Sequence, residues 1–197
     1  MAENRNLCLK PLTIKEVKKV YKLFMTHDFP RAERKPLRMI TKSLKNGNYE
    51  CLGFFEGSEL LSYAFFYKYE NFLLFDYFAT VKEKRNEGIG TEVLNEIGEY
   101  YKSSGGVFGE VEDPAFATDE SSETLMKRRF SFYLRNGFKD TGLRVELYKV
   151  NYIIIEFENV KSHTEDEMRR IYRNTYMSML PKKMYDANVS LSEQEGV

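Results

Sequence analysis

Hydrophobic positions along the chain first follow a strand pattern and then a helix pattern. The segment Leu7–Pro11 predicts a short strand, and Thr13 with Glu16 forms a capping box that predicts the start of a helix. Pro30 disfavours helix in the residue before it, so this helix should end just ahead of the proline. Apolar residues at helical spacing then predict a second helix over residues 37–44.

Three apolar runs follow at residues 49–55, 60–69 and 72–81. The segments between them are short enough for hairpin turns, so the three strands should be antiparallel neighbours. Apolar residues recur at helical spacing over 91–101, and the next apolar run, 107–112, predicts a strand. A helical crossover joins this strand to the one before the helix, so the two should be parallel.

The last third of the chain begins with an acidic, turn-rich segment, 113–123, which has the length at which loops are often functional. The elements after it are predicted as a helix, a strand broken at 140–142, a second strand and a capped helix, over 123–136, 138–150, 152–158 and 164–180. Pro181 should end the last helix, and the polar tail from Lys182 is predicted to be mobile.

This order of elements places the chain in the α/β class, in the broad sense that includes α+β folds. It predicts a single domain with a central, mixed but mostly antiparallel sheet of six to seven strands flanked by helices. We expect this domain to span residues 1–160, and a C-terminal helical extension with a mobile tail to span 161–197.

Composition argues against several functional classes. Lysine plus arginine and aspartate plus glutamate both number 30, so the formal net charge is zero and a nucleic-acid partner is not expected. No apolar run approaches the roughly 18 residues of a membrane span, and residues 1–6 lack the apolar core of a signal peptide. Cys8 and Cys51 are expected to be buried free thiols, and no Cys/His spacing predicts a metal site. We therefore expect a soluble, cytoplasmic protein without a membrane or metal partner.

The strand-to-helix junction at residues 77–91 carries the most informative motif. An apolar strand runs into a charged turn that ends in Gly88 and Gly90, directly where the helical pattern begins. A helix N-terminus offers unpaired N–H groups and the positive end of the helix dipole, and glycines let a bulky anion approach the backbone. With Arg85 as a cation at the rim, the junction predicts a cradle for a phosphate or pyrophosphate. The competing interpretation is an ordinary strand-to-helix turn.

Two common nucleotide-binding motifs do not fit this junction. The dinucleotide fingerprint needs a third glycine, but Val93 stands three residues after Gly90, and the lysine of a P-loop is missing. The remaining pattern, Arg85-x-x-Gly88-x-Gly90 after a strand, resembles motif A of the GNAT superfamily of acyl-CoA N-acyltransferases.

A second segment carries the same resemblance. The sequence Tyr133-x-x-x-Gly137-Phe138 is similar to the end of the superfamily's late helix. The resemblance covers roughly residues 7–158 and implies a GNAT-like fold that uses acetyl-CoA as co-substrate, with the coenzyme A pyrophosphate on the loop's N–H groups. It implies cofactor contacts from Phe78, Ala79, Thr80, Val81, Arg85, Asn86, Glu87, Gly88, Ile89, Gly90 and Thr91.

The resemblance also implies which residues carry acetyl transfer. Tyr133 holds the position of the tyrosine that commonly protonates the departing thiolate; the competing interpretation is an aromatic packed in the core. Glu110 and Glu112 lie two apart on a predicted strand, so both should point to one face and raise each other's pKa, which suits a base or a site for a cationic amine. The superfamily often has its base or an acceptor ligand on this strand. Glu112 is therefore the first candidate base and Glu110 the second, unless this is only a solvated strand end.

The sequence departs from the superfamily pattern on the late helix. Met126 and Arg129 stand where many members have asparagine and alanine, which puts one usual hydrogen bond to the pantetheine arm in doubt. Arg129 could meet a phosphate of coenzyme A, meet an acidic group of the acceptor, or form a surface ion pair. In the superfamily the loop between the first two helices borders the acceptor pocket. Phe29, Pro30 and Glu33 are therefore candidate substrate contacts, or else part of a plain connecting loop.

The predicted function is direct transfer of an acetyl group from acetyl-CoA to a primary amine of a small molecule or peptide, by a monomer or homodimer. Carboxylates near the end of strand 107–112 should favour a cationic amine. They are Glu110, Glu112, Asp113, Asp119, Glu120 and Glu123. Two alternatives remain open: a non-catalytic coenzyme A-binding sensor or interaction module, and an interaction protein whose terminal helix docks a partner.

Overall fold

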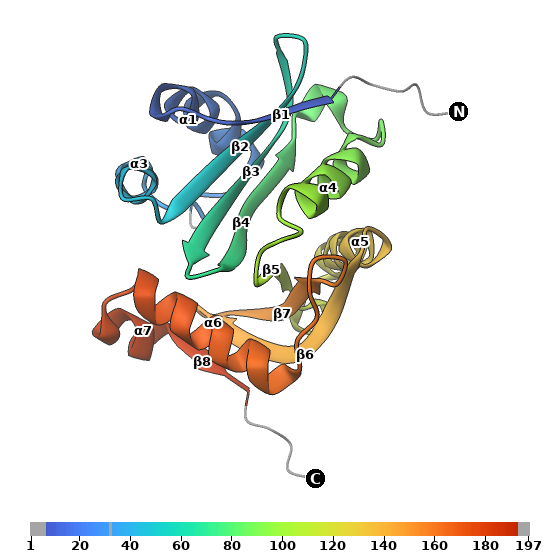
Figure 1. Cartoon of the computed structure of the whole chain (residues 1–197). Helices are drawn as coiled ribbons and strands as arrows, with labels where there is room; N and C mark the ends of the chain where they lie inside the picture. The colour runs from blue at the N-terminus through green and yellow to red at the C-terminus, as the bar shows by residue number, and fades with distance from the viewer. Residues whose placement is uncertain (1–6, 32, 193–197) are drawn as a thin grey trace. The chain divides into compact units, whose positions relative to one another are not determined.

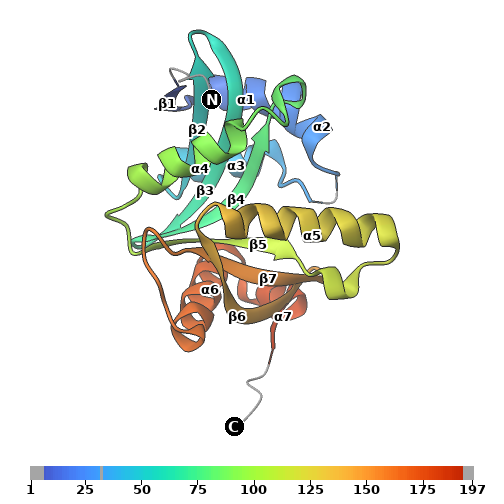
Figure 2. The same cartoon turned by 90° about the vertical axis from the view of Figure 1, so that its right-hand side faces the viewer.

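The computed structural model describes residues 7–31 and 33–192 and divides them into two compact units. Among these residues, the first unit comprises 7–68 and 75–97, and the second comprises 69–74 and 98–192. Each unit is an α/β arrangement in which helices cover both faces of the strands (Figure 1; Figure 2).

The first unit carries the elements predicted for the first half of the chain. They are β1 (Leu7–Pro11), α1 (Ile14–Val20), α2 (Thr26–Asp28), α3 (Leu37–Lys45), β2 (Tyr49–Glu56), β3 (Glu59–Tyr69), β4 (Phe72–Thr80) and α4 (Ile89–Tyr100), with the ends of β3, β4 and α4 reaching into the second unit. A π-helical turn, Tyr21–Met25, joins α1 to α2. Strand β2 pairs antiparallel with β1 and β3. The predicted capping box is confirmed, because the Thr13 N–H donates to Glu16 Oε2 at 2.8 Å.

Strand β3 carries the core of the first unit on both of its faces. Phe65 and Phe66 are consecutive and fully buried, so their rings project to opposite sides of the strand. Phe66 stacks on Phe75 with ring centroids 4.8 Å apart, and Phe65 lies edge-on to Tyr77 at 6.3 Å. Helices α1 and α3 lie on one face of β2–β4, and α4 lies on the other (Figure 1). Burial on both faces explains the continuous apolar run of β3.

The second unit is built around an antiparallel group of strands. Its elements are β5 (Gly106–Glu112), α5 (Glu120–Arg135), β6 (Phe138–Leu147), β7 (Val150–Phe157), α6 (Glu165–Met179), α7 (Lys182–Asn188) and β8 (Val189–Leu191). Strand β7 pairs with β5 and β6, and β6 pairs with β8. Helices α5 and α6 lie on opposite faces of these strands (Figure 2). Phe138, which contacts Tyr133 of α5, stacks on Phe157, whereas Phe108 contacts Tyr172 of α6.

Helix α5 begins three residues before its predicted start. Asp119 is its N-cap, and the Asp119 carboxylate accepts the Ser122 N–H at 2.8 Å. A capping aspartate satisfies one of the N–H groups that a helix start leaves unpaired. The acidic segment expected to be a loop up to residue 123 is therefore helical from Glu120.

The turn between β6 and β7 was also misplaced. Strand β6 ends at Leu147 and β7 begins at Val150, so the turn comes before Val150 and not after it as predicted. The predicted break at 140–142 coincides with a shift in the pairing register of β6 between Asp140 and Arg144. Tyr148 and Lys149 make the turn with φ values of 49° and 67°. A tight hairpin needs positive φ at both central positions, and this turn lacks the Asn-Gly type of sequence that usually marks one.

The segment after Pro181 is not the mobile tail that was predicted. It forms α7 and β8, and β8 pairs with β6 so that Val145 lies opposite Leu191. Among the described residues the strand order is β1-β2-β3-β4-β5-β7-β6-β8, which makes eight strands where six to seven were expected. The α/β class and the mostly antiparallel pairing are confirmed. The final residues of the tail, 193–197, and residues 1–6, on which the expected lack of a signal peptide depends, lie outside the described residues.

Two smaller expectations can be compared with the structure. Cys51 is a buried free thiol as predicted, but Cys8 is exposed because it lies on edge strand β1. In the part of the chain that the structure describes, no helix is both long enough and apolar enough to span a bilayer.

Candidate functional site

The junction between β4 and α4 has the backbone geometry of an anion cradle. Strand β4 ends at Thr80, a 3₁₀ turn spans Lys82–Lys84, and α4 begins at Ile89. Gly88 has φ = 82°, in the left-handed region, and no atom lies within 4 Å of the position its side chain would take. Glycine is therefore needed here for its backbone angle, and it keeps that side of the loop open.

The first turn of α4 presents N–H groups to this open side. The N–H groups of Thr91 and Glu92 both donate to the Gly88 carbonyl, at 3.0 and 3.3 Å. Those of Ile89 and Gly90 have no backbone acceptor among the described residues. Unpaired N–H groups at the positive end of a helix dipole are a ready site for an anion. The cradle predicted from sequence thus has the donors that a phosphate needs.

Arg85, predicted as a free cation at the rim, has protein partners. Its Nε donates to the Thr80 carbonyl at 3.0 Å, and its Nη2 lies 2.5 Å from Asp28 Oδ1. Asp28 is nearly buried and also accepts the Tyr63 hydroxyl at 2.7 Å. Burial and the Asp28 carboxylate raise the pKa of Tyr63 well above its usual value, so Tyr63 remains a neutral donor.

Sequence reasoning missed Asp28 for a simple reason. It lies 57 residues before Arg85, and a single acidic residue near the end of a helix gives no local signal of so distant a partner. The pairing partly neutralises the cation that the sequence seemed to offer to a phosphate.

The segment predicted to border the acceptor pocket is attached to β4. Phe29 lies edge-on to the Tyr77 ring, with centroids 5.1 Å apart. The Tyr77 hydroxyl donates to the Glu33 carbonyl and accepts the Lys35 N–H, both at 2.8 Å. Pro30 and the Glu33 side chain are exposed. The loop is therefore held by one buried tyrosine and is more than a plain connection, although contact with an acceptor stays a prediction.

A buried carboxylate next to Tyr77 strengthens this attachment. Lys35 Nζ lies 2.5 Å from Asp76 Oδ1, and the Tyr49 hydroxyl donates to the other Asp76 oxygen. Burial, together with the Asp76 charge, raises the pKa of both Tyr49 and Tyr77, so both phenols keep their protons. The sequence did not predict this network, because its members lie far apart in the chain. Lys35 precedes α3, Tyr49 lies on β2, and Asp76 lies on β4.

In the second unit, Tyr133 is partly buried on α5 among aromatic rings. It lies edge-on to Phe132 at 5.4 Å and to Phe138 at 5.3 Å between centroids. Burial raises the pKa of Tyr133 to about 12, and Arg129, one turn earlier, opposes that rise. Tyr133 is therefore a protonated phenol at neutral pH, able to donate a proton. The ring contacts fit the core interpretation equally well, so its catalytic role stays a prediction.

Packing around Tyr133 explains why Gly137 and Phe138 come directly after α5. Gly137 has φ = 86°, and a side chain there would come within 2.7 Å of Asn159 and 2.9 Å of Phe157. Phe138 stacks on Phe157 with centroids 4.5 Å apart. Glycine lets the chain turn sharply against β7, and the phenylalanine then supports the Tyr133 ring.

The candidate base Glu112 forms an ion pair. Its Oε2 lies 2.6 Å from Nη1 of Arg129, and both side chains are partly exposed, 27% and 51% respectively. Of the roles open to Arg129, the structure therefore shows the ion pair, with a strand carboxylate rather than a loop one. Exposed pairs of this kind contribute at most about 1 kcal/mol, so a ligand can displace Arg129.

Glu110 contacts a different helix. Its Oε1 accepts hydrogen bonds from the hydroxyls of Tyr172 and Tyr176, both at 2.6 Å. Both tyrosines belong to α6 and are buried, and burial raises the pKa of Tyr172 well above its usual value. The two glutamates, expected to act together, thus have partners on α6 and on α5. The sequence pattern predicted the amphipathic face of α6, but it did not indicate that tyrosines of this helix would donate hydrogen bonds to Glu110.

The acidic cluster expected beyond β5 is largely paired with neighbouring groups. Asp113 lies 3.7 Å from Arg144, Glu123 lies 2.5 Å from Lys127, and Asp119 caps α5. These contacts reduce the negative field that was expected to select a cationic amine. Among the described residues, no group of three or more His, Cys, Asp or Glu side chains could hold a metal ion.

Comparisons with known proteins can now be set beside this geometry. No protein-family model and no curated protein sequence matches the chain. A solved structure from Bacteroides thetaiotaomicron, described as an acetyltransferase of the GNAT family, is 22% identical with a TM-score of 0.67, over 88% of this chain and 99% of the other. The fold is that of the GNAT superfamily.

Two further solved structures have a similar fold. The ribosomal-protein-S18-alanine N-acetyltransferase from Escherichia coli is 13% identical, covers 81% of this chain with 97% of its own, and has a TM-score of 0.56. Arabidopsis thaliana NAA60, solved in complex with acetyl-CoA, is 13% identical, covers 77% of this chain with 98% of its own, and has a TM-score of 0.57. At these identities the similarity concerns the fold alone, and it confirms the GNAT-like fold expected from the two sequence motifs.

Proposed function

We propose that this protein is an acetyl-CoA-dependent N-acetyltransferase that moves an acetyl group directly to a primary amine. The observation that carries the proposal is the cradle at the start of α4, where the N–H groups of Ile89 and Gly90 are open beside the left-handed Gly88. In a GNAT fold this junction is the expected place for the pyrophosphate of coenzyme A. Similar structures were solved with acetyl-CoA, including the GNAT acetyltransferase from Elizabethkingia anophelis.

The roles in cofactor binding follow from the cradle. The loop and first turn, residues 85–91, would hold the pyrophosphate through backbone N–H groups, and the end of β4, Phe78–Val81 in sequence, would lie along the pantetheine arm. Arg85 remains 45% exposed while paired with Asp28, so a phosphate can share its guanidinium.

The chemistry requires one bond to form and one to break. A neutral amine nitrogen attacks the thioester carbonyl, the C–N bond forms, and the C–S bond breaks with the electron pair leaving on sulfur. Tyr133, protonated because burial raises its pKa to about 12, would give its proton to the thiolate. Glu112 would exchange Arg129 for the substrate ammonium and accept its first proton, which leaves the amine neutral for attack. The second proton, which nitrogen loses once the C–N bond has formed, would restore the Tyr133 phenol. The products are an acetylated amine and coenzyme A.

Thiol release from acetyl-CoA, measured against a panel of amines and peptides with free N-termini, tests the proposal. The expected result is amine-dependent release that matches formation of an acetylated product by mass spectrometry. Tight acetyl-CoA binding without turnover on any acceptor would contradict it.

A second candidate is a non-catalytic coenzyme A-binding module. The observation that favours it is that both candidate bases already have protein partners, Glu112 with Arg129 and Glu110 with two buried tyrosines. The third hypothesis, docking through the terminal helix, loses its basis, because the apolar face of α6 is covered within its own unit. Met168, Ile171, Tyr172, Thr175 and Tyr176 of that face are all buried.

A further inference from the structure

A pocket of about 370 Å³ lies within the second unit, and none of the residues assigned to acetyl transfer lines it. Its walls come from the turn between β3 and β4, the connection from β7 to α6, and α6 itself. Four charged side chains line it, Glu70, Lys161, Glu167 and Arg170, together with His163 and several aromatic, apolar and polar side chains.

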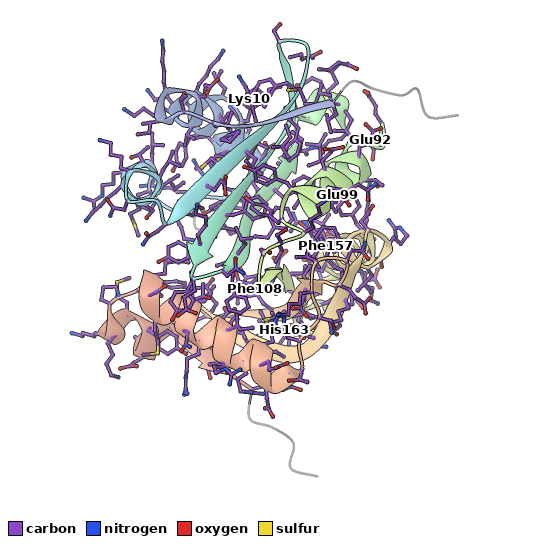
Figure 3. The ribbon with its side chains drawn as sticks, in the orientation of Figure 1. Lys10, Glu92, Glu99, Phe108, Phe157 and His163 are labelled. Carbon is purple, nitrogen blue, oxygen red and sulfur yellow. The ribbon has the colours of Figure 1, made fainter. Side chains whose placement is uncertain are left out.

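His163, which is labelled in Figure 3, lines this pocket. Its side chain is 8% exposed and lies edge-on to Phe72, with ring centroids 5.7 Å apart. Its Nδ1 contacts Glu156 Oε1, and its backbone N–H donates to Glu156 Oε2 at 2.8 Å. No described residue forms a hydrogen bond with the other ring nitrogen, Nε2. A buried imidazole that is held at one nitrogen offers the second to a ligand.

The position of this imidazole is set by several elements. Glu156 is fully buried, and Lys139 Nζ lies 3.6 Å from its Oε2 and also donates to the His163 carbonyl at 3.2 Å. Gly106, at the start of β5, leaves the space that the ring fills, because a side chain there would come within 3.0 Å of His163 Cε1. A buried carboxylate with a cation and an imidazole is costly to assemble unless each group is paired. Contacts with three residues, Glu156, Lys139 and Gly106, therefore fix the position of the His163 ring.

The charges at the pocket mouth favour an anion. Arg170 and Lys161 are exposed and form no ion pair with a described residue. The carboxylates nearby are engaged: Glu167 accepts the Thr164 N–H at 2.9 Å as part of the α6 capping box, and Glu70 is hydrogen-bonded by Tyr69. Two cations without a salt-bridge partner and an open imidazole nitrogen thus line one space, with the Glu167 carboxylate beside Arg170.

The remaining walls limit what such an anion can be. Phe72, Tyr69 and Ile171 line the pocket beside the charges, and the Asn174 amide adds one more polar group. A cavity of this size with aromatic walls suits a small organic molecule, because apolar surface supplies binding energy and a few polar groups orient the ligand.

We propose that this pocket is a second ligand site, which binds a small organic anion with a carboxylate or phosphate on an apolar, ring-sized body. The oxyanion contacts Arg170 and Lys161, and the ring lies against Phe72 and Tyr69, with His163 Nε2 facing the bound molecule. The site is independent of the proposed acetyl transfer.

The test uses benzoate, phenyl phosphate and inorganic phosphate as probes, titrated into the full chain at low salt. Calorimetry measures affinity, and NMR follows the His163 imidazole signals. We expect saturable binding of at least one aromatic probe with a shift of the His163 signals, and weaker binding of inorganic phosphate, which lacks a ring. Benzoate against phenyl phosphate separates the two kinds of oxyanion.

Matched variants on one helix distinguish a site from general surface charge. Arg170→Gln should weaken the preferred probe about tenfold, the effect of one charged hydrogen bond. Arg173→Gln removes an exposed cation three residues away on α6, outside the pocket, and should leave affinity unchanged. Acetyl-CoA affinity should be the same in both variants, so failure here is separate from failure of the proposed function.

A third variant addresses the imidazole itself. His163→Asn keeps a donor for Glu156 but removes the nitrogen that faces the pocket. It should weaken binding about tenfold. No saturable binding of any probe in the millimolar range, or equal losses in the two arginine variants, would overturn the proposal.

Discussion

The candidate site of the first unit consists of backbone groups, whereas that of the second consists of side chains. In the first, the cradle at the start of α4 is made of backbone: open N–H groups at Ile89 and Gly90 and the left-handed Gly88. In the second, the candidates are side chains, and each has a partner: Glu112 has Arg129, and Glu110 has tyrosines of α6. Backbone donors depend on neighbours a few residues away, whereas the properties of a side chain depend on what packing brings to it.

The two kinds of site differ in the substitutions that they tolerate. A backbone site tolerates most substitutions but fails when bulk or like charge enters it. A side-chain site fails when one atom is removed, and its partners decide how much remains. The following experiments test these two kinds of sensitivity, beginning with the largest expected effect.

Replacing Tyr133 with phenylalanine removes one oxygen from the second unit. If the phenol protonates the thiolate, kcat should fall by about 10²–10⁴-fold while acetyl-CoA affinity stays nearly constant. Burial raises the pKa of Tyr133 to about 12, so the wild-type phenol keeps its proton and its loss should not lower the rate until the pH approaches that value. Steady-state kinetics and calorimetry measure the two quantities. Tyr148→Phe, at an exposed turn, is the control, and an unchanged kcat in Tyr133→Phe would leave only the core role.

Introducing glutamate at Gly90 places both bulk and negative charge in the cradle. We expect the acetyl-CoA dissociation constant to rise by about 100-fold or more, because a phosphate loses its close approach and meets a like charge. Asn95→Glu adds the same charge at an exposed position of the same helix and should change affinity little. Calorimetry with both variants decides the matter: equal affinities would mean that the junction is an ordinary turn.

Replacing Glu112 with glutamine tests the ion pair of the second unit. As the base, Glu112 should contribute about 10–100-fold to kcat/KM, whereas a surface pair with Arg129 should affect stability by at most about 1 kcal/mol. Amine-dependent kinetics and chemical denaturation separate these roles. Glu110→Gln is the comparison, and a larger kinetic loss there would exchange the assignments of the two glutamates.

Replacing Asp28 with asparagine frees Arg85 in the first unit. The guanidinium would no longer be neutralised, so acetyl-CoA should bind about threefold more tightly at low salt, and high salt should remove the gain. Because Asp28 is nearly buried and accepts two hydrogen bonds, the unfolding free energy should fall by about 1–3 kcal/mol. Weaker cofactor binding in a folded variant would show that Asp28 orients Arg85 rather than competing for it.

Acceptor charge should have the smallest effect. Three of the carboxylates beyond β5, Asp113, Asp119 and Glu123, are paired or used in capping. Cationic amines should therefore exceed amino dicarboxylic acids by only about two- to threefold in kcat/KM, with less difference at high salt. A panel of acceptors at two ionic strengths measures this. A strong preference for acidic acceptors would instead assign Arg129 to the substrate.

Local sequence alone was enough for the backbone features. The capping boxes at Thr13 and Thr164 form as predicted, since each depends on residues three apart. The two glycine motifs, at Gly88 and Gly137, indicated the superfamily fold, because a left-handed backbone angle excludes most side chains.

Tertiary structure alone decided which groups meet. Asp28 reaches Arg85 across 57 residues, and Tyr172 reaches Glu110 across 62, and no local pattern announces either contact. Strand β8 is equally non-local: the polar tail forms a strand because β6 offers it an edge to pair with. A chain's sequence sets backbone conformation through nearest neighbours, but the charge and freedom of a carboxylate are set by the donors that folding places beside it.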